Sequence, residues 1–544
     1  MPFDSCRRID GELPAADGGA GHPSAHKVES VTIEQALTTA RATAVDIPHV
    51  IGGREVRTGR TAPVVAPHDH HRPLGVVHWG TAAEAEAAIN TALTAARDWH
   101  RQDWSQRVQP FRRAAELLAA GEWRDRLVAA AMLELSKTHG QADGDAAAET
   151  IDLLLAGIAN LEAAYAVQPD SVDGVTNTLD YRPLEGFVFA VSPFNYASMS
   201  HLAFGPALLG NTVVWKPAES ASWSAYLTLE LLRVAGLPDG VINLVHGNGA
   251  EIGGTVLTHP ELAAVHFTGS TATFQQIFTT VGTNIAGYRS YPRVVGETGG
   301  KGFVVVHPSA DVDALTDAVV HGAFDYQGQK CSAASRLFVP RSLWPTVRDQ
   351  LLDRTAQLRM GDPTEPGIQI GAVINARQFA KHEAALAQAR AEGLVLTGGH
   401  TDAQVGWFVE PTVLQVDDPQ SPFLTEELFA PVTAALVYDD SDWAKTLHLV
   451  DNSTGYGLTG AVFATDEHAI TEADDILRYT AGNYVINSHP TGAVVGQQPF
   501  GGARASGTND KVGTVWNTIR FLSPRSVKRV APAGPRSSTT SQPV

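Results

Sequence analysis

Cys331 is one of only two cysteines in the 544-residue chain, and it lies in the polar run Gly328-Gln329-Lys330-Cys331-Ser332. A lone cysteine is most often a buried structural residue. A thiol beside a lysine can instead be a reactive nucleophile, because a neighbouring cation favours the thiolate. The other cysteine, Cys6, lies in a polar, Gly-rich leader. Two cysteines are too few for a disulfide framework or a cysteine-based metal centre, so we expect no metal site.

Two other segments carry groups that a covalent mechanism needs. Glu297 begins the run Glu-Thr-Gly-Gly-Lys, where it is either part of a flexible surface turn or a general base. Asn195, in Pro-Phe-Asn-Tyr, directly follows an expected strand. It is either an ordinary turn residue or a neutral donor to an oxygen that develops negative charge. Each segment alone leaves both interpretations open.

Two glycine-containing segments are candidates for a phosphate-binding turn. The run at 241–254 is a partial dinucleotide fingerprint, but Ile252 stands where the third glycine is required. The run Phe267-Thr-Gly-Ser270 fits better, because Gly269 permits a close backbone approach and Ser270 can bind a phosphate at a helix N-terminus. A plain helix cap is the alternative at Ser270.

The elements that position these residues alternate between strands and helices. Short β-branched or aromatic runs predict strands at Gly186–Val191, Thr212–Trp215, Val241–Val245 and Ala263–Phe267, with helices at Ala197–Leu209, Ser222–Ala235 and Glu251–Thr258. A second region begins near Gly299, with strands at Phe303–Val306, Arg336–Val339 and Ala434–Val437 and a helix at Ala376–Glu392. This spacing predicts an α/β fold with two doubly wound parallel-sheet domains, whose ligands bind at the carboxyl ends of the strands.

Upstream of the first strand the sequence predicts helices. Thr81-Ala-Ala-Glu84 is a capping box that opens an Ala-rich helix to about Arg97, and an earlier helix is expected around Ile33–Val45. Further amphipathic segments predict helices at Arg107–Leu118, Arg124–Lys137 and Ala146–Tyr165.

Composition limits the partners. The formal net charge of -18 disfavours nucleic acid and anionic membrane surfaces. No apolar run approaches the ~18–20 residues of a membrane span. The first residues lack an apolar core and contain acids, which argues against a targeting presequence and predicts a cytoplasmic location.

Six ordered motifs together resemble the aldehyde dehydrogenase superfamily over roughly residues 47–525. They are PFNY (193–196), WKPAE (215–219), FTGS (267–270), GETGGK (296–301), GQKCSA (328–333) and EELFAPV (426–432). The resemblance implies a Rossmann-like NAD-binding domain (47–167 and 183–298), a catalytic domain (299–507) and a small β oligomerisation flap (168–182 and 508–528). Residues 1–46 would form an N-terminal extension and residues 529–544 a disordered tail. The flap implies a homodimer or higher homo-oligomer.

The resemblance also implies a mechanism. Cys331 would attack an aldehyde to give a thiohemiacetal, whose oxyanion is held by the Asn195 side chain and the Cys331 backbone N–H. Hydride would pass to NAD⁺ and leave a thioester, which water activated by Glu297 would hydrolyse to the acid.

The same resemblance assigns the NAD contacts. Lys216 and Glu219 would grip the adenosine ribose, where a carboxylate repels a 2′-phosphate and so favours NAD⁺ over NADP⁺. Ser270, next to Gly269, would contact the pyrophosphate. Glu427 would hold the nicotinamide ribose, with Phe429 packed near the ring.

The substrate follows from a second resemblance. The segment Thr491–Asp510, with FxxQGQKCSAxSR at 324–336, is similar to the anchor loop and nucleophile segment of Δ1-pyrroline-5-carboxylate dehydrogenases. These enzymes oxidise L-glutamate γ-semialdehyde to L-glutamate, the second step of proline catabolism. The α-carboxylate would be held by backbone N–H groups and a hydroxyl, and the aliphatic part by aromatic walls. The implied substrate-binding residues are Tyr196, Lys330, Ser332, Gly492, Ala493 and Phe500.

Two positions depart from this pattern. Ala493 stands where some relatives have serine, so only a backbone donor remains there. Tyr196 stands where phenylalanine is expected, which adds a hydroxyl that would bond the substrate or crowd it.

Three other interpretations of the sequence compete with this one. The first is an aldehyde dehydrogenase for another ω-semialdehyde, such as succinic semialdehyde, which would not need the anchor-loop donors. The second is a catalytically silent relative, which predicts loss of Cys331, Glu297 or Asn195, yet all three are present. The third is a cysteine hydrolase, which needs a histidine base near the thiol, and nothing in the sequence places one there.

Overall fold

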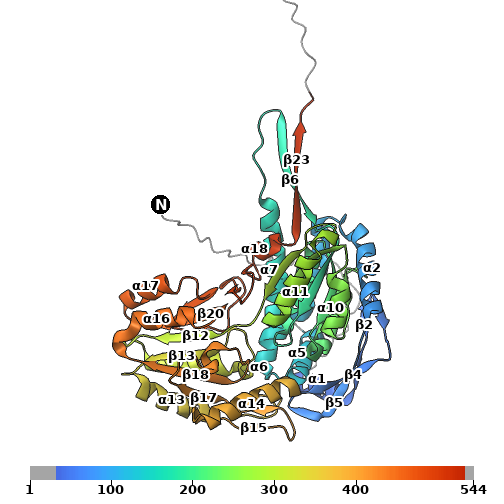
Figure 1. The fold of residues 1–544 in the computed structure, drawn as a ribbon. Coiled ribbons are helices and arrows are strands. Elements are labelled where there is room, and N and C mark those ends of the chain that lie inside the picture. Colours follow the sequence, from blue (N-terminus) through green and yellow to red (C-terminus); the bar gives the residue numbers. More distant parts are fainter. Residues whose placement is uncertain (1–31, 120, 533–544) are drawn as a thin grey trace, which may run out of the picture. The chain divides into compact units, whose positions relative to one another are not determined.

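Two seven-stranded sheets organise the chain (Figure 1). The computed structural model describes residues 32–119 and 121–532. Cys6 and the expected tail beyond residue 532 therefore lie outside the described residues. Within the described ranges, no helix is both long enough and apolar enough to cross a membrane.

The first sheet has the order β11-β10-β7-β8-β9-β2-β3. Its five parallel strands are β7 (Phe187–Ser192), β8 (Thr212–Pro217), β9 (Ile242–Leu244), β10 (Leu262–Thr268) and β11 (Arg293–Glu297). The short strands β2 (His49–Ile51) and β3 (Arg54–Val56) extend the edge in antiparallel fashion. The strands predicted in this region are confirmed to within two residues at each end.

Both faces of this sheet are buried because successive side chains on a strand point to opposite sides. Phe187 and Phe189 belong to one apolar core, and Val188 and Ala190 to another. Helices cover the two faces: α2 (Ala82–Trp99), α10 (Gly249–Leu257) and α11 (Thr271–Thr283) on one, and α4 (Gln109–Ala119), α5 (Glu122–Glu134), α7 (Thr150–Ala166), α8 (His201–Leu208) and α9 (Ser222–Val234) on the other. The predicted capping box is present, with Thr81 and Glu84 closing the start of α2.

The second sheet has the order β14-β17-β18-β13-β12-β20-β21. Its strands are β12 (Gly302–Val306), β13 (Ala334–Pro340), β17 (Thr412–Val416), β18 (Val432–Tyr438), β20 (Thr459–Phe463) and β21 (Asn483–Ile486), all parallel, with β14 (Val395–Thr397) antiparallel at one edge. Phe303 and Val304 again point into different cores. The covering helices are α12 (Val312–Phe324), α13 (Trp344–Ala356), α14 (Ala376–Ala391), α16 (Trp443–Asn452) and α17 (Glu467–Ile476). The predicted fold class, two parallel-sheet α/β units, is confirmed.

A two-stranded antiparallel ribbon stands beyond α18 (Val515–Ile519) in Figure 1. It pairs β6 (Val175–Pro183) with β23 (Leu522–Val530) along their whole lengths. The sequence predicts a strand at Thr518–Val527, which is wrong at its start because α18 ends only at Ile519. Residues 529 and 530, placed in the tail by the sequence, belong to β23.

The described part of the N-terminal extension is folded. The expected helix is α1 (Ile33–Ala42), which begins at a Thr32–Gln35 capping box and packs on α5. It is followed by β1 (Val45–Ile47), which pairs with β5 (Asp69–His78), itself paired with β4 (Thr61–Ala66). Ala36 and Leu37 are buried in the same core as the first sheet.

One helix differs from the expectation in a way that concerns the site. The segment Ala146–Tyr165 is predicted as a single helix, but it divides into a π-helical segment, η1 (Asp143–Glu149), and α7. The short helix α6 (His139–Ala142) runs into η1. A π-helical turn widens the helix and is frequent at functional sites.

Candidate active site

The nucleophile segment is held by an unusual backbone turn. After α12, Tyr326, Gln327 and Gly328 all have left-handed φ values, of 49°, 56° and 62°. Such residues are strained unless their surroundings fix them. The Tyr326 hydroxyl donates to Leu135 O at 2.9 Å, and a Cβ at position 328 would lie 2.2 Å from a backbone oxygen. Glycine is therefore required at 328, and the turn fixes the position of Cys331.

Asn195 lies against this segment. It follows β7 in a bend, and its Nδ2 donates to the Gln329 carbonyl oxygen at 3.1 Å. The Gln329 side chain is fixed in turn, because its Oε1 accepts a hydrogen bond from Ile374 N at 2.9 Å. An amide nitrogen has two N–H groups. One is used to orient Asn195, so the second is available to an oxygen beside Cys331.

Glu297 lies at the end of a strand, which removes the flexible surface turn as one of its two interpretations. It is the last residue of β11, only 6% exposed, and its Oε2 accepts a hydrogen bond from Gly502 N at 2.7 Å. The parallel sheet fixes its backbone, and the loop after β21 supplies the donor. Burial raises the pKa of the carboxyl well above its usual value, against the opposing effect of the Gly502 N–H.

The interpretation of Lys330 as an activator of the thiol is wrong. Its Nζ pairs with Asp325, whose other oxygen accepts from Gln141 Nε2 at 2.7 Å. The Lys330 ammonium is therefore engaged with Asp325, and Lys330 is not among the groups that chiefly set the pKa of Cys331. Desolvation by the surrounding protein, followed by the carboxylates of Glu427 and Glu297, raises the pKa of Cys331 to about 12.

All of the predicted catalytic and substrate-binding residues line one cavity of about 320 Å³. They are Asn195, Tyr196, Glu297, Lys330, Cys331, Ser332, Gly492, Ala493 and Phe500. They come from the ends of β7 and β11, from the turn before β13 and from the loop after β21. The structure thus brings together residues that lie up to about 300 positions apart in the chain, as expected at the carboxyl ends of parallel strands.

The loop after β21 is tied to the nucleophile segment. Ser332 Oγ lies 3.1 Å from Thr491 Oγ1, and the carbonyl oxygen of Thr491 accepts from His489 Nδ1 at 2.6 Å. Gly492 has a left-handed φ of 81°, with His489 3.1 Å from where a Cβ would lie. The backbone of the loop is therefore fixed where it faces the cavity.

Several charged residues of the cavity wall are absent from the sequence-based expectations. Lys137 and Asp145 form a buried ion pair, and Asp145 also accepts hydrogen bonds from the backbone N–H groups of Ala197 and Ser198, just after Tyr196. Glu149 lines the same wall, and burial raises its pKa to about 7. The sequence signal that could have identified Asp145 and Glu149 is their four-residue spacing in an otherwise Ala-rich helix. The predicted unbroken α-helix would have pointed the two side chains in other directions.

Four of the predicted cofactor residues lie at the ends of β8 and β10, the two strands that flank β7 in the first sheet. Lys216 is in the last part of β8 and is buried, which lowers its pKa against the opposing effect of Glu219. Its Nζ lies 3.9 Å from where a Cβ of Gly249 would be, at the start of α10. Gly269 and Ser270 join β10 to α11, and Ser270 Oγ accepts from Thr273 N at 3.3 Å. Ser270 is thus a helix cap, and its N-terminal position leaves it open to a phosphate.

The other two cofactor residues reach the nucleophile from the second sheet. They follow α15 (Pro422–Thr425), and Glu427 Oε1 accepts from Gly300 N at 2.7 Å. A Cβ at Gly299 would lie 2.2 Å from the other oxygen of Glu427, so glycine is needed for this contact. Phe429 packs edge-on against Phe194, with ring centroids 5.9 Å apart. Burial raises the pKa of Glu427 to about 7.

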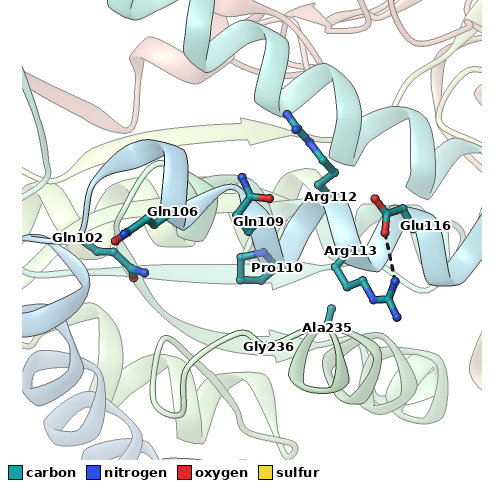
Figure 2. A pocket seen from close by; sticks show the side chains of 9 residues that line it. All are labelled: Gln102, Gln106, Gln109, Pro110, Arg112, Arg113, Glu116, Ala235 and Gly236. Carbon is teal, nitrogen blue, oxygen red and sulfur yellow. Dashed lines mark hydrogen bonds and ion pairs between the residues drawn. The ribbon is translucent and has the colours of Figure 1, made fainter. Parts of the chain in front are cut away.

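A second hollow lacks this chemistry. Figure 2 shows a surface hollow of about 400 Å³ between α4 and the residues that follow α9. It is lined by Gln102, Gln106, Gln109, Pro110, Arg112, Arg113, Glu116, Ala235 and Gly236, with an ion pair of 3.3 Å between Arg113 and Glu116. None of the predicted site residues is among them, and amides and guanidinium groups provide no nucleophile.

Known proteins resemble this chain over most of its length. The profile of the aldehyde dehydrogenase family matches residues 55–527. The chain is 42% identical over 527 residues to the mitochondrial Delta-1-pyrroline-5-carboxylate dehydrogenase of Bos taurus, covering 96% of this chain and 93% of that protein. It is 45% identical over 487 residues to the Delta-1-pyrroline-5-carboxylate dehydrogenase of Agaricus bisporus, covering 89% of each.

Solved structures show the same likeness. The crystal structure of the Delta-pyrroline-5-carboxylate dehydrogenase from Mycobacterium tuberculosis bound with NAD superimposes with a TM-score of 0.89 at 45% identity, covering 96% of this chain and 98% of that one. A 1-pyrroline-5-carboxylate dehydrogenase from Thermus with bound NAD gives a TM-score of 0.85 at 31% identity, over 92% of this chain and 96% of that one. The resemblance predicted from six motifs is therefore confirmed over nearly the whole described region: the chain belongs to the aldehyde dehydrogenase family.

Proposed function

We propose that this protein is an NAD⁺-dependent dehydrogenase that oxidises L-glutamate γ-semialdehyde to L-glutamate, the second step of proline catabolism. The observation that carries the proposal is the cavity itself. A thiol, an amide donor and a carboxyl line it together, and the rest of the wall combines apolar side chains with the hydroxyl of Ser332 and the backbone of the loop after β21. Relatives at 42–45% identity bear the name Delta-1-pyrroline-5-carboxylate dehydrogenase, and a structural neighbour is described as bound with NAD.

The residues present fit NAD⁺. Buried Lys216 and exposed Glu219 would hold the adenosine ribose, and Ser270 would meet the pyrophosphate at the N-terminus of α11. Glu427, held against Gly299 and Gly300, would hold the nicotinamide ribose, with Phe429 beside the ring. When bound, NAD⁺ supplies the hydride acceptor.

The chain's own groups carry the remaining chemistry. The Cys331 thiol loses its proton to Glu297 and forms the C–S bond with the aldehyde carbon. The resulting oxyanion takes hydrogen bonds from the free Asn195 N–H and the Cys331 backbone N–H. After oxidation to the thioester, Glu297 releases the thiol's proton to solvent and then takes a proton from water as the water oxygen attacks the acyl carbon. The C–S bond then breaks, and the acid leaves.

The raised pKa of Glu297 suits this role. A general base works best when its pKa lies near the working pH, and burial moves a carboxyl upward toward that range. The Gly502 N–H holds one oxygen of Glu297, so the carboxyl keeps a defined orientation while it takes and releases protons.

The substrate's charged end would lie at the loop after β21. The Ser332 hydroxyl and the backbone N–H groups of Gly492 and Ala493 would bind the α-carboxylate. Tyr196 and Phe500 would pack against the aliphatic part of the substrate. Lys330 is committed to Asp325, so it would contribute long-range attraction rather than a direct ion pair.

The proposal also covers the assignment of domains and the oligomeric state. The first sheet would form the NAD-binding domain (47–167 and 183–298) and the second the catalytic domain (299–507). The β6–β23 ribbon would be the oligomerisation flap (168–182 and 508–528), because its outer strand edges offer free hydrogen-bonding groups to a second copy. Sedimentation at several protein concentrations tests the resulting homodimer or higher homo-oligomer.

We also propose a cytoplasmic location. The nucleophile must stay a free thiol, and a reducing compartment maintains it. Several relatives are named as mitochondrial, so cell fractionation with a marker for each compartment decides the matter.

The decisive experiment measures NADH formation by purified protein with Δ1-pyrroline-5-carboxylate and with succinic semialdehyde. C331A serves as the inactive control, and C6S as the matched cysteine control. Preference for pyrroline-5-carboxylate that is lost only in C331A supports the proposal. Preference for succinic semialdehyde keeps the mechanism and refutes the substrate.

A further inference from the structure

Two glycines in the helical wall of the catalytic cavity have no evident backbone or packing reason to be glycine. Gly140 lies in α6 and Gly144 in η1, and both line the cavity. Neither has a left-handed φ, and a Cβ at either position would meet no atom within 4 Å. Gly300 is different, because a Cβ there would lie 2.2 Å from the Cys331 carbonyl oxygen. Glycine is also the poorest helix former apart from proline.

Gly140 borders two hollows, whereas Gly144 lines the catalytic cavity alone. An outer hollow of about 540 Å³ shares Gly140, Gln141 and Asp325 with the catalytic cavity. Gly140 and Gly144 are themselves exposed. The volume that side chains would occupy here is therefore the mouth through which the cavity opens.

The polar side chains at the rim of this mouth are fixed. The Gln141 side chain is held at both ends, because its Oε1 accepts from Thr138 N at 3.0 Å and its Nε2 donates to Asp325 at 2.7 Å. Asp325 is held in turn by Lys330. A rim made of buried or half-buried polar groups with their hydrogen bonds in place resists displacement. The width of the mouth is thus set by what stands at positions 140 and 144.

We propose that Gly140 and Gly144 determine substrate specificity by keeping this mouth wide enough for an aldehyde whose far end carries both a carboxylate and an ammonium group. Such an end is branched and hydrated, so it needs more width than an unbranched aldehyde does. The inference rests on the proposed function and adds a cause for its substrate range. It also explains why two poor helix formers stand in this wall.

The test compares G144A, G144L and G140L with G254A and G254L. Gly254 is a matched control, because it is also exposed in a helix, α10, with no atom within 4 Å of a Cβ. The measured quantity is kcat/KM for pyrroline-5-carboxylate and for propanal, which is short and unbranched. We expect G144L and G140L to lower the first value by on the order of tenfold or more and the second by less than about twofold. G144A should lie between them and the wild type, and the control variants should change neither value.

Folding is monitored in the same variants. Replacing glycine within a helix by alanine or leucine favours the helix, so the Tm of each variant should equal or exceed that of the wild type. A ratio of the two kcat/KM values that stays within about twofold of the wild type in G144L overturns the inference. Equal losses with both aldehydes overturn it too, since they indicate general damage.

The failure of the proposed function has a different signature. A wild-type enzyme that oxidises propanal but not pyrroline-5-carboxylate refutes the substrate assignment and removes the reason for a wide mouth. A wild-type enzyme active on pyrroline-5-carboxylate, with variants that keep its substrate ratio, refutes only the role of the two glycines.

Discussion

The thiol of Cys331 should react slowly with iodoacetamide in the free enzyme. Desolvation, then the charges of Glu427 and Glu297, raises its pKa from the ordinary 9.0 to about 12. Because the thiolate is the reactive form, alkylation should be suppressed near neutral pH. This is the opposite of the behaviour expected from the neighbouring Lys330 in the sequence.

The size of the effect follows from the pKa difference. A rise of three units lowers the thiolate fraction about a thousandfold at any pH below both values. A thiolate of higher pKa is more nucleophilic, with a Brønsted slope of about 0.4–0.5, which restores a factor of roughly 15–30. The net expectation is alkylation slower than in an unfolded cysteine peptide by on the order of ten- to a hundredfold.

Ionisation of Glu427 should alter how the alkylation rate of Cys331 depends on pH. Its own pKa is raised to about 7, so it gains a negative charge as the pH rises through 7. That charge is one of those that bring the pKa of Cys331 to about 12, so its appearance makes the rise of the alkylation rate with pH shallow near 7. E427Q should therefore react faster than the wild type above pH 7 and at the same rate well below it. E426Q is the matched control, because Glu426 is exposed and is not among the groups that shift the thiol.

The assay is carried out in a C6S background, so that Cys331 is the only cysteine. Alkylation is followed by intact mass from about pH 6 to 10, with C331A as the blank. A rate that levels off with a midpoint below about pH 9 would refute the reasoning, because it would reveal a thiolate stabilised in the free enzyme. Equal rates for E427Q and the wild type at pH 9 would remove Glu427 from the explanation.

Three further outcomes are expected. G299A places a Cβ 2.2 Å from the Glu427 carboxylate, so the Kd for NAD⁺ measured by titration should rise on the order of tenfold, and an unchanged Kd would contradict the role given to Glu427. S332A should raise the KM for pyrroline-5-carboxylate about tenfold and leave propanal oxidation unchanged in steady-state assays, whereas a parallel loss with both aldehydes would argue against an α-carboxylate contact. E134Q replaces a carboxylate that accepts three hydrogen bonds from the first turn of α9, two of them from Ser224, and should lower the free energy of unfolding in urea by about 1–3 kcal/mol; identical midpoints and slopes would show that these bonds do not matter.

The fold was predictable because its strands are short, apolar and regularly spaced. In β7, Phe187–Ser192 is apolar on both faces, which is typical of a parallel sheet covered by helices. Asn195 and Glu297 could be named because each lies in a motif at the end of such a strand, whereas Cys331 lies in a motif in the turn before β13. Their meeting in one cavity then follows from the parallel arrangement.

The wrong predictions concern the directions in which side chains point. Position in the chain placed Lys330 beside Cys331, but only the left-handed turn before it shows that its ammonium faces Asp325. The Gly-rich run after Glu297 left a flexible turn open as an interpretation, which the pairing of β11 with β10 excludes. The π-helical turn that aims Asp145 and Glu149 at the cavity has no signature in hydrophobic periodicity, so these residues escaped notice.

The nucleophile and the base must act as one coupled pair. Each loses a proton less easily because of burial, and the charge of Glu297 itself raises the pKa of Cys331. Two groups that interact in this way titrate as a pair rather than separately. A thiolate beside an ionised Glu297 is then the least favourable state, and transfer of the thiol proton to Glu297 avoids it, because the pair keeps a single negative charge throughout. The same burial protects the resting enzyme, because oxidation of cysteine also depends on thiolate character. A reactive sulfur thus arises where an aldehyde can take up the electron pair and Asn195 can stabilise the resulting oxyanion.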